Sequence, residues 1–95
     1  MISAEELKNS VREWAKEVGV TPKEIHLRKM NRKMASCSSK GRLTFSFALL
    51  KEPLDARAEA IVHELLHMKY PNHGKMFNLL LVTHLKNKGI KIKSK

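Results

Sequence analysis

Hydrophobic residues recur every three to four positions in three segments of the chain, and this spacing predicts three amphipathic helices. The first segment follows Ser3-Ala4-Glu5-Glu6, in which Ser3 and Glu6 have the spacing of a capping box. Gly19 comes directly after the last apolar position and is a natural helix end. We therefore expect the first helix over residues 4–18. Its buried side would consist of Leu7, Val11, Trp14, Ala15 and Val18.

The second and third helical segments lie in the second half of the chain. The second follows Pro53, with Asp55 as the candidate cap, and stops before Tyr70-Pro71. The third begins at Gly74 and is closed by Gly89. Both segments are apolar on one side only, so each should pack against a shared core.

Strict alternation of apolar and polar residues predicts two strands. Ile25 and Leu27 alternate with polar neighbours in the first of them. In the second, over residues 43–47, Phe45 and Phe47 would lie on one buried face. An extended substrate could add along the edge of this second strand, although a plain sheet strand explains the pattern equally well.

A short strand near residues 34–36 could complete a three-stranded sheet, and the tail over residues 90–95 alternates again, as a strand or a loose arm. Together these elements predict an α+β fold in one domain over residues 1–95.

Cys37 is the only cysteine, which excludes an internal disulfide. The chain shows no signal-peptide pattern and no bilayer-spanning run, so we expect a cytoplasmic monomer without a membrane partner.

The net charge of +10 is unevenly distributed. Residues 23–42 carry seven basic side chains and one acidic one, and residues 65–95 carry seven lysines and no acid. Such blocks attract DNA or RNA through its phosphates, with Arg28, Lys29, Arg32 and Lys33 as the candidate contacts. A lysine-rich, solvated surface is the alternative interpretation.

The sequence His63-Glu64-Leu65-Leu66-His67 within the second helix points to metal chemistry. Residues four apart lie on one helix face, so both histidines can reach one ion. Glu64 can reach a water bound to that ion, take its proton and pass it to a leaving amine. Three protein ligands with one open position are typical of a catalytic zinc site. The alternative is two ordinary histidines beside a solvated carboxylate.

The third ligand has more than one candidate. His73 follows His63 by ten residues, just beyond the helix end, whereas His84 lies on the apolar face of the third helix. No Asp or Glu follows Glu64, so a carboxylate ligand would have to come from upstream. We favour His73 and interpret His84 as a packed histidine or one that supports the ligands.

Three other residues have functional and structural interpretations. Tyr70, between the ligands, could support the transition state with its hydroxyl, but packing is the simpler role. Cys37 could be a nucleophile or a fourth ligand, although a partly buried thiol in a serine-rich turn fits better. His26, on the first strand, is expected to be exposed.

Two motifs resemble those of the YgjP-like predicted metallopeptidases. Residues 34–41 are similar to that family's R-W-G-S-C-S-S-K-G segment, and residues 63–67 and 70–73 to its H-E-L-x-H and H-P-N-H. Residues 73–77 also resemble the H-G-x-x-F segment of the SprT-like proteases, which include Spartan, whose corresponding histidine is the third zinc ligand. The sequence departs from the first pattern at Met34-Ala35, where the family has Trp-Gly, and at Tyr70.

The resemblance implies a minimal zincin-like domain that consists of an N-terminal helix, a small sheet, the metal helix and a backing helix. It also implies one Zn²⁺ per chain and hydrolysis of peptide bonds in a peptide or protein. The SprT-like relatives process proteins crosslinked to DNA, which would give the basic blocks a role. The YgjP-like group has also been linked to hydrolysis of nucleotide pyrophosphates.

Our leading hypothesis is a zinc metallopeptidase with Glu64 as the general base. A nucleic-acid-associated module with a metal site and a nucleotide hydrolase are the alternatives.

Overall fold

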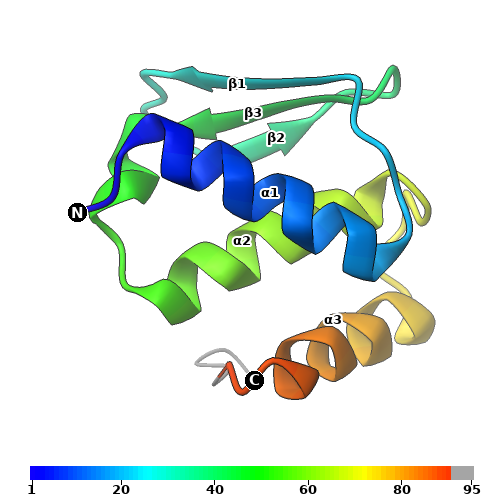
Figure 1. The fold of residues 1–95 in the computed structure, drawn as a ribbon. Coiled ribbons are helices and arrows are strands. Elements are labelled where there is room, and N and C mark those ends of the chain that lie inside the picture. The colour runs from blue at the N-terminus through cyan, green and yellow to red at the C-terminus, as the bar shows by residue number, and fades with distance from the viewer. Residues whose placement is uncertain (91–95) are drawn as a thin grey trace.

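The computed structural model describes residues 1–90, and its elements form a sheet with helices on one face. Helices α1 (Ala4–Val18) and α2 (Leu54–His67) cover the sheet, and α3 (Lys75–Asn87) packs on α2 away from it (Figure 1). The predicted α+β class is confirmed. No helix within the described residues is long and apolar enough to span a membrane.

Helix α1 has the predicted bounds and caps. The Ser3 hydroxyl accepts a hydrogen bond from the Glu6 backbone N–H, and the Glu6 carboxylate accepts one from the Ser3 N–H. Gly19 ends the helix with φ 87°, a left-handed conformation that glycine adopts without strain. Leu7 and Val11 are fully buried against α2, while Trp14 is half-buried.

The sheet has the order β1-β3-β2, with strands at Glu24–Arg28 (β1), Ala35–Cys37 (β2) and Arg42–Ser46 (β3). β3 is the central strand, parallel to β1 and antiparallel to β2. The predicted addition of a substrate along residues 43–47 is therefore wrong, because β3 is paired on both sides. The free edges of the sheet belong to β1 and β2.

Phe47 differs from its prediction. It begins a short 3₁₀ helix, η1 (Phe47–Lys51), and its side chain is exposed rather than buried beside Phe45. The cause is Ser46, whose buried hydroxyl accepts a hydrogen bond from the Ala48 N–H and so caps the new turn. This cap ends the alternation one residue before Phe47.

Helices α2 and α3 otherwise lie where the pattern placed them. Asp55 is not the α2 cap, because Pro53 holds that position without a side-chain hydrogen bond and Asp55 lies in the first turn. The predicted tail structure at 90–95 falls outside the described residues, except for Ile90, which is buried. Helices α2 and α3 contribute several aliphatic side chains and one phenylalanine to the hydrophobic core beneath the sheet. These are Ala58, Ile61, Val62, Leu65, Leu66, Phe77, Leu81 and Leu85.

Candidate metal centre

The last two turns of α2 separate the core from a polar cluster. Leu65 and Leu66 are buried in the core, which fixes the rotation of the helix and leaves the opposite side to His63, Glu64 and His67. The side chain of His63 is 34% exposed and that of Glu64 is 12% exposed. Nδ1 of His63 lies 3.3 Å from a carboxylate oxygen of Glu64. The helix thus presents two imidazoles and one largely buried carboxylate side by side.

His73 returns to this cluster from the turn that follows α2. The Tyr70 N–H donates to the Leu66 carbonyl over 2.7 Å, which closes the helix end before Pro71 redirects the chain. Nε2 of His73 then lies 2.8 Å from Nε2 of His67. One ring nitrogen from each of His63, His67 and His73 lies within 4.8 Å of the others. The structure therefore brings together the three predicted ligands.

This arrangement fits a single metal ion. Two nitrogens bound about 2.1 Å from one zinc ion at a tetrahedral angle lie about 3.4 Å apart, so small ring rotations would bring all three nitrogens into place. Three imidazoles without a cysteine or carboxylate form a donor set that suits zinc and other late first-row divalent metals. A fourth position would remain open on the solvent side.

The protonation state of His67 suits metal binding. Its pKa lies below the ordinary value, first because burial disfavours the imidazolium and then because His63 lies close by. A lowered pKa favours the neutral ring, and only the neutral ring has a lone pair for a metal.

Phe77, on the first turn of α3, lies against the histidine cluster, and in the sequence it stood out only as the last residue of the H-G-x-x-F segment. Its ring centroid lies 5.2 Å from that of His63, 4.9 Å from that of His67 and 4.7 Å from that of His73. The Phe77 side chain is 1% exposed, and its ring packs against all three imidazoles. Its place three residues after Gly74 was the only available signal.

A groove of about 700 Å³ runs between the histidine cluster and β2. Residues 33–39 form one wall, and Ala60, Pro71 and the cluster form the other. The Met34 carbonyl and the Ser38 N–H both pair with β3. Because pairing alternates along an antiparallel strand, the backbone groups of Ala35 and Cys37 point to the free edge instead. Within residues 1–90, β2 therefore offers unpaired N–H and C=O groups beside the cluster.

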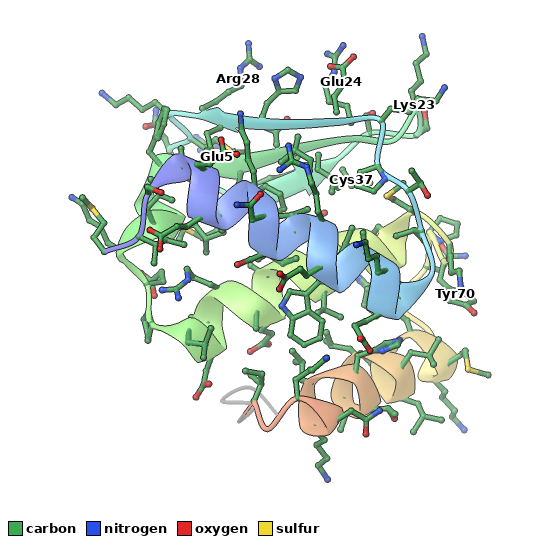
Figure 2. The ribbon with its side chains drawn as sticks, in the orientation of Figure 1. Glu5, Lys23, Glu24, Arg28, Cys37 and Tyr70 are labelled. Carbon is green, nitrogen blue, oxygen red and sulfur yellow. The ribbon has the colours of Figure 1, made fainter. Side chains whose placement is uncertain are left out.

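Cys37 lines the same groove (Figure 2). Burial raises the pKa of its thiol, and the charge of Glu64 raises it further. The thiol donates to the Ser38 carbonyl over 3.4 Å. A protonated, half-buried thiol is a poor nucleophile, which agrees with the structural interpretation of this residue.

The other candidate residues lie outside the ligand cluster. Tyr70 is half-buried in the turn after α2 and packs against the hydrophobic core (Figure 2). His84 is half-buried on α3 and does not belong to the cluster. His26 is exposed on β1, as expected, with Nε2 2.6 Å from a carboxylate oxygen of Glu24.

The four predicted nucleic-acid contacts are all exposed, at the end of β1 and in the loop that follows. Arg28 points away from the helices from the outer face of the sheet (Figure 2). Lys33 differs from the other three, because it also lines the metal-side groove. Within residues 1–90 none of the four forms an ion pair.

Comparisons with known proteins agree with this architecture. The family model of the YgjP-like metallopeptidase domain matches residues 2–89. The crystal structure of the metallopeptidase zymogen abylysin from Pyrococcus abyssi superposes with a TM-score of 0.67 at 24% identity, over 86% of each chain. At that identity the likeness establishes a shared fold. A search of curated proteins found no match.

Proposed function

The chain belongs to the YgjP-like metallopeptidase domain family, and from this premise we propose that it is a zinc-dependent peptidase with His63, His67 and His73 as ligands. The observation that carries the proposal is the approach of three ring nitrogens to within 4.8 Å beside a largely buried carboxylate. A structural zinc site would be closed by a fourth protein ligand. Here the three histidines line a groove, which supports an open site.

Glu64 is the proposed general base and acid. When bound, zinc would polarise the scissile carbonyl and lower the pKa of the attacking water. The Glu64 carboxylate takes a proton from this water as the new C–O bond forms, and returns it to the amine nitrogen as the C–N bond breaks. Its carboxylate lies 3.3 Å from Nδ1 of His63, and Glu64 lines the same groove as the three histidines.

The edge of β2 is the proposed guide for the substrate. An extended peptide paired with Ala35 and Cys37 would run along the groove and carry its backbone past the histidines. The hydrogen bonds would be to main-chain atoms, so this contact positions any peptide sequence. Side-chain preference must then come from the residues that line the groove.

Metal analysis joined to a cleavage assay tests the proposal. We expect about one zinc per chain after purification, cleavage of unfolded protein substrates, loss of both with a chelator, and recovery on adding zinc. Mass spectrometry of the products would identify the bonds cut. Stoichiometric zinc without cleavage of any peptide or protein would contradict the peptidase assignment.

Nucleic-acid binding is a second candidate, and the charge of the β1 region favours it. Arg28, Lys29 and Arg32 are exposed, and within the described residues they form no ion pairs. We expect weak DNA or RNA binding that falls with salt and is lost when these residues are changed to Gln, with zinc content unchanged. No detectable binding of DNA or RNA at low salt would exclude nucleic-acid binding as a function.

A further inference from the structure

A second cavity continues from the metal-side groove. It has a volume of about 290 Å³ and shares Ser38, Ser39 and His67 with the groove. Its remaining polar lining comes from Thr21, Lys23 and Lys40. The two spaces meet at a ligand of the proposed metal, so whatever fills the second cavity lies beside the reacting bond.

The chain builds this cavity with a tight turn between β2 and β3. Gly41 has φ 88°, and its carbonyl accepts a hydrogen bond from the Lys23 N–H over 2.9 Å. This contact brings Lys23 beside the turn that carries Lys40, although the two are far apart in sequence. The Ser38 Oγ accepts hydrogen bonds from the Lys40 and Arg42 N–H groups. Its own hydroxyl proton is left to donate.

The cavity has an uncompensated positive charge. Its lining includes two lysines and no carboxylate. Neither lysine forms an ion pair in the part of the chain that the structure describes. Other cations of this small protein do find partners: Arg42 lies 3.1 Å from Glu24, and Lys88 lies 3.2 Å from Glu17. The residues that line the cavity include two lysines and three hydroxyl-bearing side chains, and ammonium and hydroxyl groups are donors that suit a carboxylate.

We propose that this cavity binds an acidic side chain of the peptide substrate, within about three residues of the scissile bond. The inference rests on the proposed peptidase function and adds a substrate class to it. A peptide that follows β2 past residues 33–39 advances about 3.3 Å per residue and meets the cavity directly after the histidines. Lys23 and Lys40 then select Glu or Asp at one position, while β2 binds the main chain.

Paired peptides provide the first test. A set of blocked octapeptides, each with one Glu moved along the sequence, is compared with the same set carrying Gln. We expect one position near the scissile bond at which Glu raises kcat/KM by roughly 3- to 10-fold, an effect that shrinks in high salt. Equal kcat/KM for Glu and Gln at every position would overturn the proposal.

Three variants locate the effect. Lys40→Met should remove most of the preference for Glu, and Lys40→Glu should reverse it in favour of Lys. Lys40 is exposed and its side chain makes no hydrogen bond within residues 1–90, so the fold should be unaffected. Lys51→Met removes the same charge at an exposed site that lines neither cavity, and it should leave the preference intact. If Lys51→Met lost the preference for Glu to the same extent, the cause would be the net charge of the protein, and the proposed cavity site would be wrong.

Binding separates this inference from the peptidase proposal. In NMR titrations of the metal-free protein, the Glu peptide should shift the amide signals of Thr21, Lys23 and residues 38–41 more than the Gln peptide does. Such shifts would support the cavity even if no peptide were cleaved. Shifts elsewhere, or identical shifts with both peptides, would overturn it. If a nucleoside triphosphate shifted these signals to saturation and the Glu peptide did not, the ligand of the cavity would be a phosphate rather than an acidic side chain.

Discussion

Two regions of the molecule each place a histidine beside a glutamate, and they use the pair differently. On the outer face of the sheet, Glu24 lies 2.6 Å from His26 and 3.1 Å from Arg42, and its side chain is 49% exposed. In the groove, Glu64 lies 3.3 Å from His63 and is 12% exposed. The pKa of Glu24 is lowered, first by the hydrogen bond from His26 and then by Arg42. Its charge is thus already compensated.

A histidine beside a glutamate is therefore not sufficient for a catalytic site. Glu24 has two donor neighbours, His26 and Arg42, and a side chain that is half exposed to solvent. Glu64 has histidines that are suited to a metal and a groove that can hold a substrate. The difference comes from the helix, which holds its carboxylate between the core and the groove.

The largest expected effect is on catalysis. Glu64→Gln should lower kcat by about 10²- to 10⁴-fold, because the amide cannot accept the proton of the attacking water. Zinc content should stay at the wild-type value, since Glu64 is not a proposed ligand. Glu24→Gln is the matched control and should keep full activity. Equal rates for wild type and Glu64→Gln would refute the assigned role.

The next effect is on metal affinity. His73→Ala should weaken zinc binding by roughly 100-fold or more, because it removes one of three nitrogens. His26→Ala and His84→Ala should leave it unchanged, since neither ring belongs to the cluster. Competition with a chromogenic chelator measures all three. If His84→Ala were as damaging as His73→Ala, the ligand set would be wrong.

A smaller effect is expected on substrate binding. Ala35→Pro removes an N–H that points to the free edge of β2, so it should raise KM about 3- to 10-fold, as for the loss of one hydrogen bond. Ser36→Pro removes an N–H that pairs with β3 and should instead lower the melting temperature. Steady-state kinetics and thermal denaturation separate the two. An unchanged KM in Ala35→Pro would exclude pairing along β2.

The smallest effect concerns Cys37. Because its pKa is raised, few thiolates are present at neutral pH, and alkylation of the metal-free protein should reach half its maximal rate at a higher pH than for a free thiol. Glu64→Gln removes one cause of the rise, so the profile should move to lower pH and the rate at pH 8 should increase by less than about 3-fold. Glu24→Gln should not move it. A profile identical to that of free cysteine would contradict this environment.

Local patterns in the sequence were sufficient to place the helices and to group the three histidines. The capping box and Gly19 predicted both ends of α1. The three histidines could be grouped because His63 and His67 share a helix face and His73 follows at the next turn of the chain. Both inferences depend on residues within about a dozen positions of one another.

Long-range pairing could not be predicted. Alternation in residues 43–47 indicated a strand but not that β1 and β2 would cover both its sides, which moved the free edge to β2. The buried cap at Ser46 and the convergence of Lys23 with Lys40 also arise from tertiary contacts. The contact of Phe77 with three imidazoles likewise depends on how α3 docks.

The position of His73 in the connector between α2 and α3 has a mechanical consequence. Helix α3 packs mainly on α2, and at its C-terminal cap Lys88 forms an ion pair with Glu17 of α1. The proposed metal, bound by α2 and the connector, would hold the other end of α3 in place, because a ligand that binds only the folded state adds to its stability. Amide exchange in α3 would then report metal loading, and chelation would loosen this helix before the sheet.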